Sequence, residues 1–425
     1  MQTRLLLPLL ALTATVATAQ TKPVKVEVRQ TQGRYELLRG GKPYFINGAG
    51  GGQFPERVKA YGGNSIRTWS THNADKVLAE AQKNGLTVML GLDVARERHG
   101  FDYNNPQAVA EQLQKLRAEV LKYKDSPALL FWGIGNELNL EYTNPKVWDA
   151  VQQIAQMIHE VDPNHPTSTV LAGLNQKEVD YIKAKCPAVD IISINTYAGL
   201  GEIPQQVRTT GWTGPYVVAE WGPTGHWESP VTPWKASVEE TSSQKAAVYQ
   251  SRYEASVAKD KTQCLGTYVF LWGQKQERTP TWYGIFTEDG KESEVVDVMQ
   301  YLWSGKWPQN RAPHLTSFKL DGKQATDNVQ LQPGQSYPAV VAVSDPDKDP
   351  LTYRYELLPE STDLKSGGDR ESRPVAIPGL IPAGAKAQTT LKAPTKEGAY
   401  RLFVYAYDGK DNVATANIPF YVKGK

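Results

Sequence analysis

Between residues 44 and 271 the chain alternates between apolar, strand-like runs and longer helix-like segments, and this limits the fold more than any other feature. Such alternation is typical of α/β proteins built on a parallel sheet. Eight runs over about 250 residues match the size and strand count of a (β/α)8 TIM barrel. The predicted strands are Tyr44–Asn47, Ser65–Trp69, Thr87–Leu92, Ala128–Gly135, Ser168–Ala172, Ile191–Asn195, Tyr216–Ala219 and Gly266–Leu271.

The segments between these runs carry a helical pattern, because their apolar residues recur three and four positions apart. Val109, Leu113, Leu116 and Val120 show the pattern clearly. The predicted helices are Asp75–Lys83, Pro106–Tyr123, Pro145–Val161, Gln176–Lys185, Ser243–Ala258 and a last one over Glu294–Trp303.

The periodicity changes after a proline-punctuated linker at residues 307–314, which indicates a domain boundary. Residues 315–425 show short alternating runs without helices, which predicts a C-terminal β-sandwich of the immunoglobulin or fibronectin type. Within it, residues 359–382 are rich in Ser, Gly, Asp and Pro, and we expect a long loop there. Before the barrel at residues 43–306, residues 20–42 predict a β-hairpin that packs on the barrel.

Residues 1–19 have the features of a cleavable signal peptide: Arg4, a leucine-rich run at residues 5–12, and the small residues Ala17-Thr18-Ala19. We therefore expect a periplasmic or extracellular protein. No later stretch has the apolar length needed for membrane insertion. The formal net charge of +2 does not indicate a protein that binds nucleic acid. Cys186 and Cys264 are expected to be unpaired, and the oligomeric state is not predicted.

Two of the predicted strands end in a glutamate. Strand four runs into Asn136-Glu137, and strand seven runs into Glu220-Trp221. Barrel enzymes keep their chemistry at the carboxyl ends of the strands, so these glutamates should face each other across the barrel mouth. Cleavage of a glycosidic bond needs one carboxylic acid to protonate the leaving oxygen and one carboxylate to meet the developing positive charge. A chance pair of strand-end glutamates is the competing interpretation, and the barrel context favours catalysis.

These motifs resemble the clan A retaining glycoside hydrolases, particularly the family 2 TIM-barrel domain. The resemblance implies that Glu220 is the nucleophile and Glu137 the acid/base. It also implies that Asn136 binds the sugar 2-hydroxyl. The chain lacks the large N-terminal sandwich domains of full-length family 2 enzymes, so their galactosidase or glucuronidase specificities are not carried over.

Three further positions match the clan pattern. Arg67, in Ser65-Ile66-Arg67, resembles the arginine that keeps the nucleophile ionised. Tyr197, after Ile194-Asn195-Thr196, resembles the tyrosine that hydrogen-bonds the nucleophile. Trp272 lies where strand eight supplies the platform under the cleaved sugar.

Weaker signals come from residues on the flanking loops and from an acidic turn. Trp69, His99 and Trp227 are candidate sugar-binding residues, although packing within the loops explains such residues about as well. The turn Asp345-Pro346-Asp347-Lys348-Asp349, together with Asp408 and Asp411, offers oxygen ligands for calcium. Ordinary turn chemistry is the favoured interpretation, and we expect neither a metal nor a cofactor.

The sequence therefore predicts an exported retaining glycoside hydrolase that cleaves β-glycosidic bonds in a β-glucan or a related polysaccharide or oligosaccharide. One alternative is a transglycosylase that remodels glucans with the same two glutamates. The other is a non-catalytic carbohydrate-binding envelope protein. Sugar, linkage and endo or exo action are left open.

Overall fold

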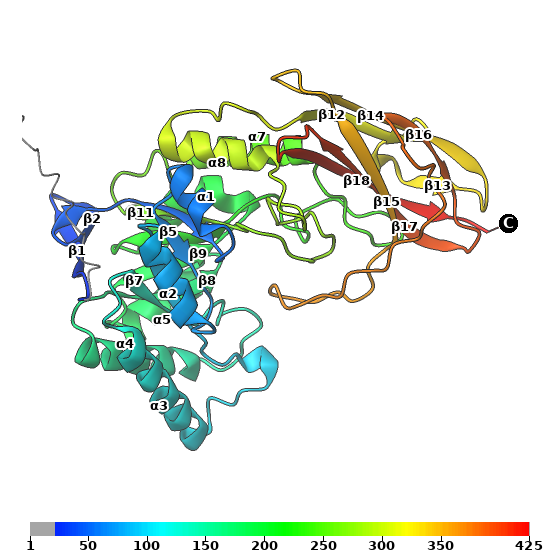
Figure 1. Cartoon of the computed structure of the whole chain (residues 1–425). Coiled ribbons are helices and arrows are strands. Elements are labelled where there is room, and N and C mark those ends of the chain that lie inside the picture. The colour runs from blue at the N-terminus through cyan, green and yellow to red at the C-terminus, as the bar shows by residue number, and fades with distance from the viewer. Residues whose placement is uncertain (1–21, 425) are drawn as a thin grey trace, which may run out of the picture.

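The computed structural model describes residues 22–424, so the predicted signal peptide lies outside the described residues. The described chain begins with a small antiparallel sheet, coloured dark blue in Figure 1, made of β1 (Val26–Thr31), β2 (Arg34–Arg39) and β3 (Lys42–Pro43). Val26 and Leu37 of this sheet pack in one cluster with barrel residues such as Ile46 and Leu130. The sheet therefore covers the apolar interior at one end of the barrel.

Eight parallel strands close into a barrel, which confirms the predicted fold class. Every residue of β6, β7, β10 and β11 is buried, because the barrel interior lies on one side and the helices on the other. This two-sided burial explains why the strands appear in the sequence as nearly continuous apolar runs. The barrel strands are β4 (Ile46–Gly50), β5 (Ser65–Arg67), β6 (Thr87–Leu92), β7 (Leu129–Ile134), β8 (Thr167–Ala172), β9 (Ile191–Asn195), β10 (Tyr216–Trp221) and β11 (Cys264–Val269).

Helices follow the strands and pack on the outside of the barrel. Their ends carry recognisable signals: Asn105 caps α3 and Pro106 opens it, while Thr241 and Gln244 form a capping box at α7. The short helices α1 and α6 were not predicted, because they contain too few turns to show a helical period of apolar residues. The helices are α1 (Pro55–Ala60), α2 (Ala74–Lys83), α3 (Pro106–Tyr123), α4 (Lys146–Val161), α5 (Gln176–Lys185), α6 (Ile203–Thr209), α7 (Ser242–Ala255) and α8 (Glu294–Ser304), with 3₁₀ turns η1 (Glu97–His99) and η2 (Ala198–Glu202).

The C-terminal region is the predicted sandwich, with two sheets in the orders β12-β14-β16 and β13-β18-β17-β15. Residues such as Leu320, Leu402 and Phe420 fill its core between the sheets. The three-residue strand β13 was not predicted. The strands are β12 (His314–Leu320), β13 (Val329–Leu331), β14 (Ser336–Ser344), β15 (Thr352–Pro359), β16 (Gln388–Lys392), β17 (Gly398–Tyr407) and β18 (Val413–Val422), with the 3₁₀ turn η3 (Ala325–Asp327).

The sandwich rests on the barrel through α7, which contacts β12 and β18 and packs beside α8 near the top of Figure 1. The backbone NH of Thr415 donates to Ser242 Oγ, and that of Leu315 donates to Ser243 Oγ. The buried guanidinium of Arg401 donates to the carbonyl of Ser237, at 2.8 Å. Buried polar contacts of this kind fix the sandwich at one orientation, because a shift would leave the polar groups without partners.

The segment between β15 and β16, coloured orange in Figure 1, leaves the sandwich and runs back toward the barrel. It contains no helix or strand, in agreement with the predicted loop. Cys186 and Cys264 are both buried and free. Among the described residues, no helix has the length and apolar character needed to cross a membrane.

Candidate active site

A cavity of about 310 Å³ opens at the carboxyl end of the barrel strands. Glu137, just after β7, and Glu220, in β10, both line it, so the two predicted glutamates share one site. We call this cavity the first lobe. It is also lined by Trp69, Arg96, Asn136, Tyr197, Trp227, Phe270, Leu271, Lys275, Glu277, Gly367, Gly368 and Asp369.

Glu220 is buried and receives three hydrogen bonds on its carboxylate. Arg67 Nη1 donates to Oε1 at 2.8 Å, Trp69 Nε1 donates to the same oxygen at 2.7 Å, and Tyr197 Oη donates to Oε2 at 3.1 Å. Arg67, at the end of β5, is only 1% exposed, so its charge is poorly screened by water. The cation and the three donors together compensate the negative charge of this buried carboxylate.

Glu137 has a different environment. Its backbone adopts a left-handed conformation with φ of 53°, and its NH donates to the carbonyl of Val170 at 2.9 Å. Asn195 Nδ2 donates to its Oε1 at 2.9 Å. Burial, and after it the negative charge of Glu220, raise the pKa of the Glu137 carboxyl from 4.5 to about 7. A carboxyl group with such a pKa holds a proton near neutral pH and can donate it.

Asn136 connects the two glutamates. Its Oδ1 accepts from Arg67 Nη2 at 2.6 Å and from Asn195 Nδ2 at 3.2 Å. Both contacts use the oxygen, so the amide nitrogen is the atom available to donate to a substrate hydroxyl. Arg67 and Asn195 thereby orient Asn136 and each bind one glutamate directly.

Trp272, predicted as the sugar platform, does not reach the cavity. Its fully buried ring packs on Phe286 and Trp303, at centroid distances of 5.2 and 5.3 Å, and Nε1 donates to the carbonyl of Phe54. Phe270 lines the first lobe instead, edge-on to Trp69 at 5.8 Å. The prediction was wrong because β11 ends at Val269, so strand alternation no longer sets the direction of the later side chains.

The three candidate sugar-binding residues on the flanking loops do not all reach the first lobe. Trp69 and Trp227 line the first lobe, but His99 does not. The His99 ring lies against the sandwich, with Nε2 at 3.0 Å from Asp369 Oδ2. Trp227 is 59% exposed and packs edge-on against Tyr197 at 5.3 Å, so its ring is available to a ligand.

A second cavity, of about 460 Å³, adjoins the first on the Glu137 side, and we call it the second lobe. Glu137, Tyr197, Trp227 and Gly367 line both lobes, whereas Glu220 lines only the first. A chain of sugars that crosses Glu137 would therefore occupy both lobes. The second lobe is completed by Leu140, Glu141, Ala172, Gly173, Asn195, Thr196, His226, Glu228, Arg278, Lys365 and Ser366.

Several site residues were not predicted as such. Asn195 lies inside the quoted Ile194-Asn195-Thr196-Tyr197 motif, and its place at the end of a barrel strand was a usable signal. Lys275 and Glu277 follow β11 and form an ion pair at 2.7 Å. Residues 365–369 come from the sandwich, and no local pattern in the sequence places them at the barrel mouth.

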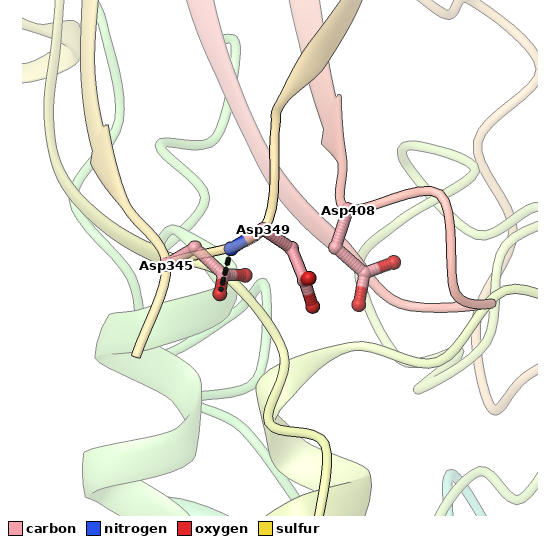
Figure 2. Close-up of side chains that lie close together, drawn as sticks. All are labelled: Asp345, Asp349 and Asp408. Carbon is pink, nitrogen blue, oxygen red and sulfur yellow. Dashed lines mark hydrogen bonds between the residues drawn. The ribbon is translucent and has the colours of Figure 1, made fainter. Parts of the chain in front are cut away.

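The acidic turn of the sandwich brings three aspartates together, and Figure 2 shows Asp345, Asp349 and Asp408 side by side. Asp345 Oδ1 accepts from the backbone NH of Asp349, and Asp408 Oδ1 accepts from those of Lys410 and Asn412. Asp349 pairs with Lys410 Nζ at 2.8 Å. These are contacts of turn-closing residues, and the expectation that no metal is needed stays a prediction.

Asp347 and Asp411 lie outside this cluster. Asp347 accepts from the backbone NH of Arg311, and Asp411 pairs with Lys291 of the barrel at 2.5 Å. The five aspartates considered as possible calcium ligands therefore separate into a cluster of three and two residues with other partners.

A closed parallel barrel with two glutamates in unlike environments at its carboxyl end defines a site of the glycosidase class. Residues 59–262 match the family model described as Glycosyl hydrolases family 2, TIM barrel domain. This match confirms the resemblance drawn from the sequence motifs.

Among known proteins, mannan endo-1,4-beta-mannosidase F of Aspergillus clavatus is 26% identical over 146 residues, which are 30% of this chain and 34% of that protein. A Bacteroides uniformis beta-glucuronidase 2, covalently bound to cyclophellitol-6-carboxylate aziridine, has a TM-score of 0.53 at 15% identity over 94% of this chain and 48% of that chain. A Bifidobacterium dentium beta-glucuronidase complexed with coumarin-3-O-glucuronide has a TM-score of 0.52 at 17% identity over 66% of this chain and 49% of that chain.

The structural likeness at these identities concerns the fold alone. The chain spans about half the length of the two glucuronidases and matches about a third of the mannosidase.

Proposed function

We propose that the protein is a retaining glycoside hydrolase that cleaves β-glycosidic bonds by double displacement. The observation that carries the proposal is the contrast between the two glutamates in one cleft. Glu220 receives three hydrogen bonds, one of them from a cation, whereas Glu137 is held by an amide and has a pKa of about 7. This contrast suits Glu220 to act as the nucleophile and Glu137 to act as the proton donor.

In the first step, the Glu220 carboxylate attacks the anomeric carbon while Glu137 gives its proton to the leaving oxygen. The glycosidic bond breaks, and a covalent glycosyl ester forms on Glu220. Ester formation removes the negative charge beside Glu137, so its pKa falls and its carboxylate becomes a base. In the second step, Glu137 takes a proton from water, whose oxygen attacks the anomeric carbon and releases Glu220. The amide of Asn136 donates to the 2-hydroxyl in both transition states.

We propose a β-linked glucan or a related polysaccharide as the substrate. The two lobes meet at Glu137, which provides room for sugars on both sides of the scissile bond. Trp69, Phe270 and the exposed Trp227 present aromatic faces and edges to these lobes, and such surfaces pack on sugar rings. The names of the glucuronidases and of the mannosidase all specify a β linkage but different sugars, which supports the β configuration and leaves the sugar to experiment.

The test is a panel of β-glucans, β-mannans and β-xylans, with products separated by chromatography. Wild-type protein should release oligosaccharides or monosaccharides from at least one member. Glu137→Gln and Glu220→Gln should each lower kcat by about a thousandfold or more, because each removes an obligatory group. Glu111→Gln, on the exposed outer face of α3, is the matched control and should retain full activity. Near-normal turnover by either active-site variant would overturn the proposal.

A second candidate function, transglycosylation, is favoured by the second lobe. This cavity lies on the acid/base side of the site and carries Trp227, so it can hold an acceptor sugar that competes with water. With a hexasaccharide as the substrate, transglycosylation predicts products longer than six sugars at high substrate concentration, detected by mass spectrometry. Hydrolysis predicts only shorter products at every concentration.

We also propose that the protein is exported, on the evidence of the signal-like residues 1–19. Mass spectrometry of the protein secreted by its native host should show a mature chain that begins at Gln20. A cell-retained chain that keeps residues 1–19 would contradict export.

A further inference from the structure

The sandwich domain supplies part of the wall of the catalytic cleft. Residues 364–371, here called the 364–371 segment, lie in the long connection between β15 and β16. Gly367, Gly368 and Asp369 line the first lobe beside Glu220 and Glu137, and Lys365, Ser366 and Gly367 line the second. Gly367 thus borders both lobes at the point where they meet.

One anchor of the segment is the loop after β11. Lys275 Nζ donates to the carbonyl of Gly368 at 2.6 Å. The buried carboxylate of Glu371 accepts from the backbone NH of Arg278 at 2.6 Å and from that of Lys365 at 3.0 Å. Glu371 therefore ties the two ends of the segment to each other and to the barrel. A buried carboxylate with two backbone donors holds its neighbours firmly, because breaking the contacts leaves a buried charge unsatisfied.

The other anchor is the loop after β6. His99 Nε2 lies 3.0 Å from Asp369 Oδ2, and Arg98 Nη2 lies 3.9 Å from Asp369 Oδ1. A Cβ at Gly367 would lie 2.6 Å from the Arg98 guanidinium, which would have to shift, and the φ of +58° at Gly367 is one that favours glycine. In the barrel, β6 and β11 are separated by β4 and β5, so the segment bridges loops that are not neighbours.

We propose that the 364–371 segment is a substrate-binding wall and that Asp369 contacts the hydroxyl groups of the sugar in the first lobe. The inference rests on the proposed function. Asp369 lines the lobe, its side chain is 45% exposed, and each of its oxygens retains a lone pair for a sugar hydroxyl after the contacts to His99 and Arg98. The ligand class is a hydroxyl-rich sugar, since a carboxylate accepts hydrogen bonds from hydroxyl groups.

The substitutions that test the proposal are Asp369→Asn, which keeps the shape of the side chain, and Asp369→Ala. Two controls separate substrate contact from domain docking. Asp411→Ala breaks another ion pair between sandwich and barrel, away from the lobes. His99→Ala removes the ring that contacts Asp369 but leaves the Asp369 carboxylate itself in the protein. Kinetics are measured on the full chain with the best substrate among cellohexaose, mannohexaose and xylohexaose, after calorimetry shows that each variant is folded.

The expected result is a rise in KM of about tenfold to a hundredfold for Asp369→Ala, as for the loss of a charged hydrogen bond. Asp369→Asn should show a smaller rise, His99→Ala a still smaller one, and Asp411→Ala should match wild type. Kinetics of Asp369→Ala that equal those of Asp411→Ala, or that are reproduced in full by His99→Ala, would overturn the proposal while the proposed function stands. Absence of wild-type turnover on every glycan would refute the proposed function, and this inference with it.

Discussion

Replacing Glu137 by glutamine should stabilise the folded protein at pH 8 and leave its stability at pH 4 nearly unchanged. The Glu137 carboxyl has a folded-state pKa of about 7 against an ordinary value of 4.5, because burial and the charge of Glu220 disfavour its ionised form. The native state therefore binds this proton more tightly than the unfolded chain does. The free energy of unfolding therefore falls as the pH rises from 4.5 to 7. At pH 8 the cost of ionising Glu137 in the folded protein is fully present.

The pKa difference of about 2.5 pH units corresponds to about 3 kcal/mol at 1.36 kcal/mol per unit. Glu137 is partly exposed to the cleft, so screening by water makes this value an upper bound. Glutamine has a similar shape and cannot ionise, which removes the penalty. Relative to wild type, Glu137→Gln should thus gain up to about 3 kcal/mol between pH 4 and pH 8.

Urea unfolding at both pH values, followed by tryptophan fluorescence and far-UV circular dichroism, measures this difference. Glu111→Gln is the control for the loss of one exposed carboxylate, and it should shift stability by the same small amount at both pH values. An equal effect of Glu137→Gln at pH 4 and pH 8 would show that the Glu137 pKa is ordinary. The assignment of Glu137 as the acid would then lose its physical basis.

Three further predictions follow from the site. The kcat/KM of wild type should fall above about pH 7 as Glu137 loses its proton, and a profile that stays flat to pH 9 would contradict this. Tyr197→Phe removes one donor to Glu220 and should lower kcat/KM by about tenfold to a hundredfold; unchanged steady-state kinetics would count against the contact. Phe270→Ala should raise KM, whereas Trp272→Ala should mainly destabilise the barrel, by about 3 to 5 kcal/mol in urea unfolding; the opposite pattern would restore Trp272 as the platform.

The barrel could be predicted closely because its signals are local and repeated. The strands Thr87–Leu92 and Ile191–Asn195 and the helix Pro106–Tyr123 have the predicted bounds. Each strand is buried on both faces, so its apolar run is continuous, and each long helix shows its period over several turns. The two glutamates could be found for a related reason, since barrel enzymes gather their active-site residues at the carboxyl ends of the strands.

Predictions became less accurate where a residue follows the end of a regular element. Trp272 lies only three residues beyond Val269, yet its ring packs on Trp303 in the helical layer while Phe270 reaches the cleft. Once the strand has ended, local φ and ψ angles decide which way each side chain points, and the apolar pattern does not encode them. His99 was misplaced similarly, because its partner Asp369 is distant in sequence.

The contribution of the sandwich to the wall of the cleft could not be predicted from the sequence, for a different reason. Residues 365–369 have the composition of a solvated loop, rich in glycine and polar side chains. Their position follows from how α7 seats the sandwich on the barrel and from the contacts of Glu371, Lys275 and His99 that anchor the segment. Both are long-range contacts between domains, which no period or turn signal reveals.

Trapping of the covalent intermediate would identify the nucleophile directly. Wild-type protein is incubated with 2-deoxy-2-fluoro-β-glucosyl and 2-deoxy-2-fluoro-β-mannosyl fluorides, and the adduct is located by peptide mass spectrometry. Fluorine at position 2 slows hydrolysis of the ester more than it slows its formation with a good leaving group, so a retaining enzyme accumulates the adduct. Double displacement with Glu220 as the nucleophile predicts one sugar per chain, attached to Glu220, and none on Glu220→Gln. Attachment to any other residue, or turnover of substrate without a trappable adduct, would contradict it.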